Sequence, residues 1–108
     1  MEQLNRVELR GTVGSVYVKD FGTTRCVNFS VATNYCFKDR EGYPVVETTW
    51  HRVLAWENQD TAYAFKMKKG DSVHVIGRLR IQRYTGADGV ERQAVEIVAN
   101  RIHLLKEE

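Results

Sequence analysis

The sequence predicts an all-β domain interrupted by one short helix. Apolar and polar residues alternate in five segments, and turn-forming residues separate these segments, as expected for a small barrel or sandwich. One stretch, residues 58–70, lacks the alternation and carries helix signals instead. The 108 residues are enough for one hydrophobic core, so we expect a single domain over residues 1–108.

The first two segments alternate clearly. Apolar residues occupy every second position over 7–13, but after Gly14 they move to Val16 and Val18. Such a change of phase predicts a β-bulge or a barrel corner at Gly14. In the second segment the apolar side chains over 27–31 alternate with polar or small ones, which predicts a strand with one buried face.

The third segment, residues 48–56, reads TTWHRVLAW. Successive side chains of a strand point to opposite faces, so two indoles and a guanidinium are expected on one face and smaller residues on the other. The first face carries Trp50, Arg52, Leu54 and Trp56, and the second carries His51, Val53 and Ala55. For His51 the pattern favours packing or a subunit contact over contact with a ligand.

The helix is expected over residues 58–70. Asn58 or Asp60 would be its N-cap, lysines follow in the last turn, and Gly70 stands at the C-terminal cap position.

The last two strands follow this helix. One face of the fourth strand is expected to be core, as is part of the fifth strand, which changes phase near Asn100. The side chains expected to point inward are Val73, Val75, Gly77, Leu79 and Ile81 in the fourth strand and Val95 and Ile97 in the fifth.

Five strands with one helix between the third and the fourth is the order of the OB-fold, a partly open five-stranded Greek-key barrel that binds oligonucleotides or oligosaccharides. Residues 36–45 and 85–91 would then be the loops of the second-to-third and fourth-to-fifth hairpins. Each loop carries charge and has an aromatic residue at or beside one end.

Positive charge is concentrated in residues 66–84. The formal net charge of the chain is only +2, yet this segment holds six lysines and arginines against Asp71 alone. The concentration favours a polyanionic partner, although a solvated lysine-rich helix end beside an arginine-rich strand edge would give the same pattern.

Metal, disulfide and membrane signals are missing from the sequence. Cys26 and Cys36 form no CxxC, and the three histidines are scattered, so we expect no metal site, no disulfide and no cofactor. The N-terminus has no apolar leader, and no apolar run is long enough to cross a membrane. We therefore expect a cytoplasmic protein without membrane contact. No nucleophile, base and orienting group recur in a recognisable context, so we expect no enzymatic activity.

Four aromatic residues that the expected core does not need point to an unpaired nucleic acid. A tryptophan on a strand is often simply half buried, so one indole alone decides nothing. Together, however, the four lie beside lysines and arginines, and unpaired bases offer flat faces to such rings while phosphates meet the cations. These residues are Phe37, Trp50, Trp56 and Tyr84.

Five blocks of the chain resemble consecutive blocks of the bacterial single-stranded DNA-binding protein family. They are NRVELRGTVG, VNFSVATN, TTWHRVLAW, KKGDSVHVIGRLR and DGVERQAVEIVA. The resemblance implies base stacking by the four aromatic residues, a homotetramer (a dimer is possible), and His51 near the subunit interface. It also implies phosphate contacts by Arg6, Arg52, Lys69, Arg80 and Arg83.

The resemblance implies sequence-independent binding and protection of single-stranded DNA in replication, recombination and repair. The chain departs from the family after Leu105, where KEE replaces a linker and acidic tail, so we expect a short form without tail-mediated recruitment of replication proteins. Two alternatives stay open at this point. They are a primosomal replication-restart adaptor of the same fold and an RNA chaperone of cold-shock type.

Overall fold

The computed structural model describes residues 1–105 and has the predicted order of elements. Residues 106–108, on which the expected absence of an acidic tail partly depends, lie outside the described residues. The five strands are β1 (Val7–Asp20), β2 (Arg25–Lys38), β3 (Pro44–Trp56), β4 (Ser72–Thr85) and β5 (Glu91–Leu104), with one 3-10 turn, η1 (Ala62–Phe65), between β3 and β4. The all-β class and the helical turn before β4 are confirmed.

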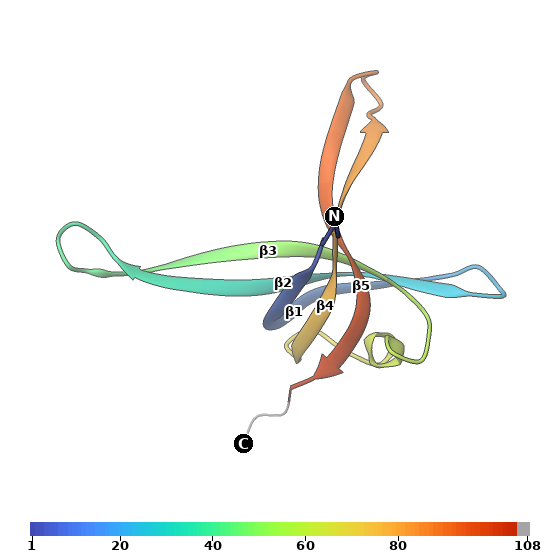
Figure 1. The fold of residues 1–108 in the computed structure, drawn as a ribbon, viewed down its shortest axis with the longest axis horizontal. Helices are drawn as coiled ribbons and strands as arrows, with labels where there is room; N and C mark the ends of the chain where they lie inside the picture. The colour runs from blue at the N-terminus through green and yellow to red at the C-terminus, as the bar shows by residue number, and fades with distance from the viewer. Residues whose placement is uncertain (106–108) are drawn as a thin grey trace.

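The strands close into a barrel in the order β1-β2-β3-β5-β4, with β4 pairing back onto β1. Four of the pairings are antiparallel. The fifth, between β3 and β5, is parallel and rests on two residue pairs, Val53 with Ile97 and Leu54 with Val98. This is the Greek-key barrel expected of an OB-fold, and Figure 1 shows its strands crossing at the centre of the molecule.

Both predicted changes of phase are confirmed as irregularities of the ladder. The pairing of β1 with β2 shifts register between Val13 and Val16, at the position of Gly14. The pairing of β4 with β5 shifts between Ile76 and Gly77, which leaves Asn100 as the extra residue of β5. Bulges bend a strand and re-aim its side chains, so they let long strands pass from one side of the barrel to the other.

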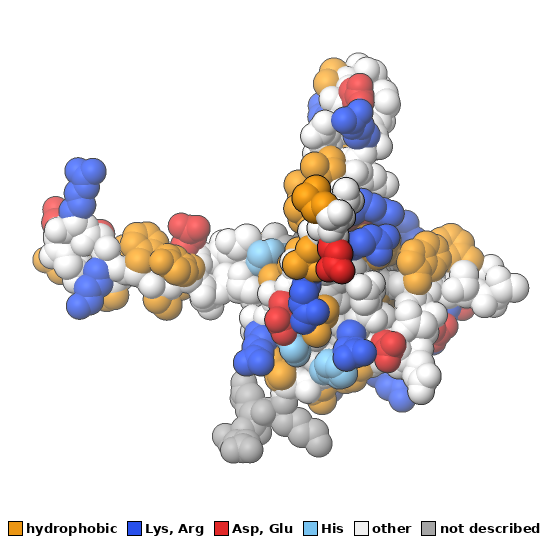
Figure 2. Space-filling view, in the orientation of Figure 1, with side chains coloured by type: hydrophobic (Ala, Val, Ile, Leu, Met, Phe, Trp, Pro, Cys, Tyr) orange, Lys and Arg blue, Asp and Glu red, His pale blue; other side chains and the backbone are white. Residues whose placement is uncertain are grey.

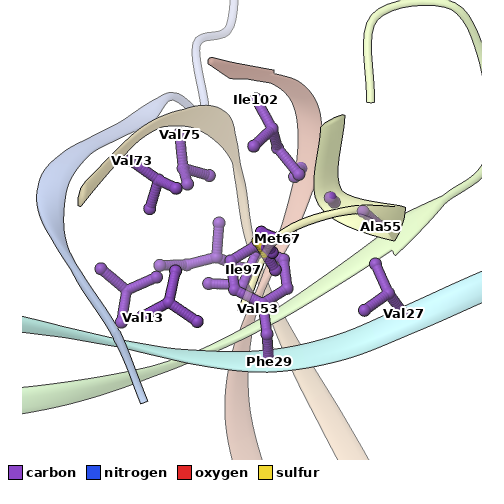
Figure 3. Packing of buried hydrophobic residues seen from close by; sticks show 13 residues of the cluster. Val13, Val27, Phe29, Val53, Ala55, Met67, Val73, Val75, Ile97 and Ile102 are labelled. Carbon is purple, nitrogen blue, oxygen red and sulfur yellow. The ribbon is translucent and has the colours of Figure 1, made fainter. Parts of the chain in front are cut away.

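The core lies where the strands cross (Figure 3). Val73 and Val75 are completely buried, as predicted, and Met67 joins the core from the segment after η1. The buried cluster consists of Val13, Val27, Phe29, Val31, Val53, Ala55, Ala64, Met67, Val73, Val75, Ile97, Ala99 and Ile102.

The prediction that Leu79, Ile81 and Val95 point into the core is wrong. Their exposed fractions are 44%, 56% and 56%, because β4 and β5 extend beyond the barrel as a two-stranded arm. The β2–β3 and β1–β2 hairpins project in the same way, in two other directions (Figure 1). The radius of gyration is accordingly 16.2 Å, against about 13 Å for a compact chain of this length.

The expected helix is shorter than predicted. It is a single 3-10 turn whose N-cap is Thr61, so the assignment of the cap to Asn58 or Asp60 is wrong. The Thr61 hydroxyl donates to the carbonyl of Trp56 at 2.6 Å, which fixes the chain as it leaves β3. The Asn58 side chain instead accepts the backbone N–H groups of Asp60 and Thr61 in the preceding turn.

No helix among residues 1–105 is long and apolar enough to span a membrane.

Candidate nucleic-acid interface

Strand β3 separates its side chains as predicted. Trp50 and Trp56 are 60% and 44% exposed, and Arg52 between them is also exposed. Val53 and Ala55 on the other face are buried in the core. Alternation along a strand therefore forces two large rings and one cation outward on the same face.

The indole of Trp50 lies against β1, beside the first bulge. A Cβ atom on Gly14 would overlap Cζ3 of Trp50 and would lie 3.0 Å from Cη2, so the ring packs directly on the glycine backbone. Gly14, Ser15, Ser30, Trp50 and Lys69 line one hollow. An aromatic ring and a lysine thus share a surface depression, which is an arrangement that suits a base and its phosphate.

The loop that carries Lys69 is held to the barrel by its neighbour Asp71. The Asp71 carboxylate accepts the Lys68 backbone N–H at 3.0 Å and the Tyr63 hydroxyl at 2.8 Å. The backbone of Val13 exchanges hydrogen bonds with Gly70 and Asp71. The Lys68 N–H and the Tyr63 hydroxyl hold the pKa of Asp71 below its usual range. Burial and the same bond raise the pKa of Tyr63 to about 12.

Trp56 has a neighbour that sequence reasoning missed. The ring of Phe21, in the turn between β1 and β2, lies 5.8 Å from the ring of Trp56 at an interplanar angle of 34°. Phe21 is 58% exposed. A turn closed by the bond from the Phe21 N–H to the Thr24 carbonyl holds it there. The two rings form a continuous aromatic surface at one end of the β3 face.

Phe37 lies near the end of β2 on the β2–β3 hairpin, and it is also paired. Its ring centroid is 5.9 Å from that of Tyr35 and the planes are stacked at 29°. Phe37 is 39% exposed and Tyr35 is 68% exposed. Because Tyr35 precedes Phe37 by two residues on the strand, both rings project from the same face of the hairpin.

Tyr84, towards the outer end of the β4–β5 arm, shares a hollow with Arg52. Arg52, Gln82, Tyr84 and Ala94 line a common hollow, although Arg52 comes from β3 and Tyr84 from β4. Figure 2 shows apolar side chains beside lysine and arginine side chains at the foot of this arm. One hollow is lined by Trp50 and Lys69 and another by Arg52 and Tyr84, and a third hollow, lined by both Trp50 and Arg52, connects them. The structure therefore brings these four residues to one connected surface.

The remaining predicted cations differ in their surroundings. Arg80 donates from Nε to a carboxylate oxygen of Glu96 at 2.9 Å, and its Nη2 contacts the same oxygen. Arg6 lies 3.9 Å from Glu8 in an exposed ion pair. Arg83 directly precedes Tyr84 on β4, so it projects from the opposite face of the arm.

His51 lies on the core side of β3 and is half-buried. A ring nitrogen of His51 is 2.8 Å from the hydroxyl oxygen of Thr33 on β2. This hydrogen bond between the two paired strands holds the imidazole in place. Its predicted place near a subunit interface stays a prediction.

Three residues of this surface were not singled out by the sequence, namely Phe21, Tyr35 and Glu96. Tyr35 had a usable signal, because it shares the strand phase of Phe37. Phe21 had a weaker one, an aromatic residue in a turn. Glu96 had none, since alternation placed it outward, whereas the structure leaves it only 8% exposed.

Comparisons with known proteins agree with this geometry. Residues 4–105 match the model of the "Single-strand binding protein family". A single-stranded DNA-binding protein of Neisseria meningitidis serogroup A is 38% identical over 105 residues, which cover 94% of this chain and 60% of that relative. A mitochondrial single-stranded DNA-binding protein of Danio rerio is 34% identical over 116 residues, covering 98% and 79% of the two chains.

Two solved structures share the fold over nearly the whole chain. Plasmodium falciparum SSB in complex with ssDNA superposes with a TM-score of 0.83 at 28% identity, covering 97% of this chain and 96% of the other. The single-stranded DNA binding protein from Thermus aquaticus, as a deletion mutant, gives a TM-score of 0.79 at 25% identity, covering 95% and 51%.

Proposed function

The chain belongs to the single-strand binding protein family, and from that premise we propose that it binds single-stranded DNA without sequence preference and protects it. The single observation that carries the proposal is the outward face of β3, on which Trp50, Arg52 and Trp56 are all exposed. Leaving two indoles in water does not stabilise the fold, so their exposure is best explained by a partner with flat apolar faces that covers them.

Base stacking is the first half of the proposed mechanism. Trp50 and Trp56 are separate stacking platforms along an extended strand, because they lie six positions apart on β3. Phe37 stacks on a base at the β2–β3 hairpin, and Tyr84 does so on the β4–β5 arm. Each stacked base contributes about 1–3 kcal/mol and tolerates any sequence, because every base has a π-face. Phe21 and Tyr35 widen two of these platforms, since each ring centre lies 5.8 or 5.9 Å from that of a proposed stacking residue.

Phosphate neutralisation is the second half. Arg52 and Lys69 lie beside Trp50 and Tyr84, so a backbone that follows the rings passes both cations. Arg6 and Arg80 extend the positive surface towards the β4–β5 arm, and Arg83 offers a cation on the opposite face of the arm. Asn5 fixes the chain next to Arg6 against β4. Its side-chain amide donates a hydrogen bond to the carbonyl of Leu79 and accepts one from the Leu79 N–H, each at 2.8 Å.

The family resemblance extends the proposal to assembly and use. We propose that the chain forms a homotetramer in which His51 lies near a subunit interface. We also propose that the protein binds and protects single-stranded DNA during replication, recombination and repair. The chain spans 60% of the length of the Neisseria relative, so these wider roles rest on the family and not on the geometry of the barrel.

The direct test is a titration with oligo-dT followed by intrinsic tryptophan fluorescence. Both indoles are exposed, so we expect strong quenching at low salt, and each single variant, Trp50→Phe or Trp56→Phe, keeps one indole as the reporter and should bind oligo-dT more weakly. A matched oligo-U competitor should displace the DNA poorly. No quenching at low salt would contradict DNA binding, and preferred binding of oligo-U would indicate an RNA chaperone instead.

A further inference from the structure

The candidate interface contains one carboxylate that is almost completely buried. Glu96 on β5 is 8% exposed and pairs in register with Arg80 on β4. Both Nε and Nη2 of Arg80 bond the same oxygen, Oε1, while 43% of the arginine side chain stays exposed. A negative charge is therefore fixed inside a surface proposed to receive a polyanion.

Glu96 also lies close to the central cation of this surface. Two separate hollows are lined by both Arg52 and Glu96, one towards β1 and β2 and the other towards Trp50 and the β4–β5 arm. Among residues 1–105, Arg52 itself forms no ion pair with a carboxylate, and neither do Lys69 and Arg83. Arg80 is thus the one proposed phosphate ligand that a buried acid neutralises in that part of the chain.

Burial determines what this pair does to an approaching phosphate. Charges that are shielded from water interact more strongly than exposed ones, so Glu96 cancels much of the attraction that Arg80 would offer. A phosphate could take Arg80 only by leaving Glu96 charged and unpaired in a buried position, which is unfavourable. An isolated arginine such as Arg52 has no such competitor.

We propose that Glu96 is a built-in counter-charge that weakens the binding of single-stranded DNA by holding Arg80 in a neutral pair. The inference rests on the proposed function and assigns a role to a residue that contacts no base. A strand-coating protein must release its DNA to other enzymes, and an internal competitor for one arginine lowers affinity without removing a stacking ring.

The test is the variant Glu96→Gln, which removes the charge and keeps a side-chain oxygen for Arg80. Binding of oligo-dT is measured by tryptophan quenching over a series of salt concentrations. We expect binding roughly tenfold tighter at low salt, and a log-log salt slope steeper by about 0.7, the value for one additional phosphate contact on a single strand.

Glu91→Gln is the matched control. Glu91 lies on the same strand, at the tip of the arm, and carries the same charge, but it pairs in register with Thr85 rather than with an arginine. We expect the affinity of this variant for oligo-dT to change by about twofold or less, because an exposed charge that neutralises no arginine is screened by salt.

The double variant Arg80→Gln, Glu96→Gln provides a second measurement, and it still tests the proposal if Glu96→Gln alone does not fold. It keeps the net charge of the pair at zero, so we expect the affinity and salt slope of the unaltered protein. Weaker binding by either variant would overturn the proposal and would mean that Glu96 orients Arg80 for a phosphate. Unchanged binding by Glu96→Gln would also overturn it, because the charge of Glu96 would then have no effect on the DNA. Failure of the unaltered protein to bind oligo-dT would instead refute the proposed function itself.

Discussion

The indole of Trp50 rests on the backbone of Gly14. A Cβ atom at residue 14 would overlap Cζ3 of the ring and would lie 2.7 Å from the hydroxyl oxygen of Ser30. The bulge of β1 and the outward face of β3 are therefore one structural unit. The glycine keeps the ring low on the surface, beside Lys69, instead of letting it stand away from the barrel.

Gly14→Ala is expected to displace the Trp50 ring. Adding a methyl group to a filled contact forces neighbouring groups to shift and costs about 1–3 kcal/mol of stability. We also expect a changed tryptophan emission spectrum and roughly fivefold weaker binding of oligo-dT, because a tilted ring loses part of a stacking contact worth about 1–3 kcal/mol. Emission, urea unfolding and oligo-dT titration measure the three effects.

Gly89→Ala is the control for this substitution. Gly89 has a φ of +79° in the β4–β5 turn, and a Cβ atom there would have no neighbour within 4 Å. Alanine should strain this left-handed backbone and lower stability by roughly 1 kcal/mol, yet leave the Trp50 emission unchanged. Equal emission changes in the two variants would contradict the contact between Gly14 and Trp50.

Phe21 and Trp56 should act together in binding DNA. Their ring centroids are 5.8 Å apart, and aromatic pairs at such distances contribute about 0.5–1.5 kcal/mol beyond the area they bury. A double-mutant cycle with Phe21→Ala and Trp56→Ala, measured by urea unfolding, should give a coupling energy in that range, and the same cycle measured by oligo-dT affinity should give losses that are not additive. Tyr43→Ala, on the β2–β3 hairpin, should show no coupling to Trp56.

Arg80→Ala should destabilise the protein far more than Arg83→Ala. Loss of Arg80 leaves the Glu96 carboxylate buried without its partner, and we expect a cost of about 2 kcal/mol, below the usual range for a fully buried pair because Arg80 is partly exposed. Arg83 is exposed and forms no ion pair within residues 1–105, so its removal should cost less than about 0.5 kcal/mol. Urea unfolding measures both values. Equal losses of unfolding free energy in the two variants would show that the Glu96 carboxylate does not need Arg80 as its partner.

Periodicity predicted the barrel well because its signal is strongest where one face of a strand is buried. The separation of Trp50 from Val53 on β3, and the change of phase at Gly14, both follow from side-chain direction alone. Even the order of elements needed no tertiary information, since turn residues separate the five alternating segments.

The errors begin where strands leave the barrel. Ile81 and Val95 keep the apolar phase, and they face each other in register, but on the projecting arm neither face is covered. A pattern of residues shows which side chains share a face and not whether another layer covers that face. The partnership of Phe21 with Trp56 was missed for a related reason, because the length and twist of the β1–β2 hairpin decide it.

Acid should weaken the anchoring of the Lys69 loop through Asp71. The pKa of Asp71 is lowered by the Lys68 N–H and by the Tyr63 hydroxyl, while the ordinary value is 3.8. A lowered folded-state pKa stabilises the protein above the ordinary value, and this contribution is lost as the pH falls through the lowered one. The Tm difference between the unaltered protein and Asp71→Asn should therefore be constant near neutral pH and shrink below about pH 4.

Tyr63→Phe tests the same anchor from the other side. It removes the hydroxyl that donates to Asp71 at 2.8 Å and keeps the ring. The pKa of Asp71 should rise, though not to its ordinary value, because the Lys68 N–H remains. The loss of Tm on acidification of the Tyr63→Phe variant should then lie between the losses of the unaltered protein and of Asp71→Asn. If the Tm difference between the unaltered protein and Asp71→Asn instead grew as the pH fell, the anchoring role of the Asp71 carboxylate would be contradicted.

Salt dependence gives the last prediction, because it counts the cations that meet phosphates. Each phosphate contact on a single strand contributes about −0.7 to the slope of log Kobs against log salt concentration, so five contacts per engaged subunit predict about −3.5. If Glu96 keeps Arg80 neutral, four contacts remain and the slope should be near −2.8, or about −0.7 for each. Oligo-dT titrations between low and moderate salt distinguish the two values. A slope shallower than about −1 would mean that stacking acts almost alone and that Arg52 and Lys69 do not meet the backbone.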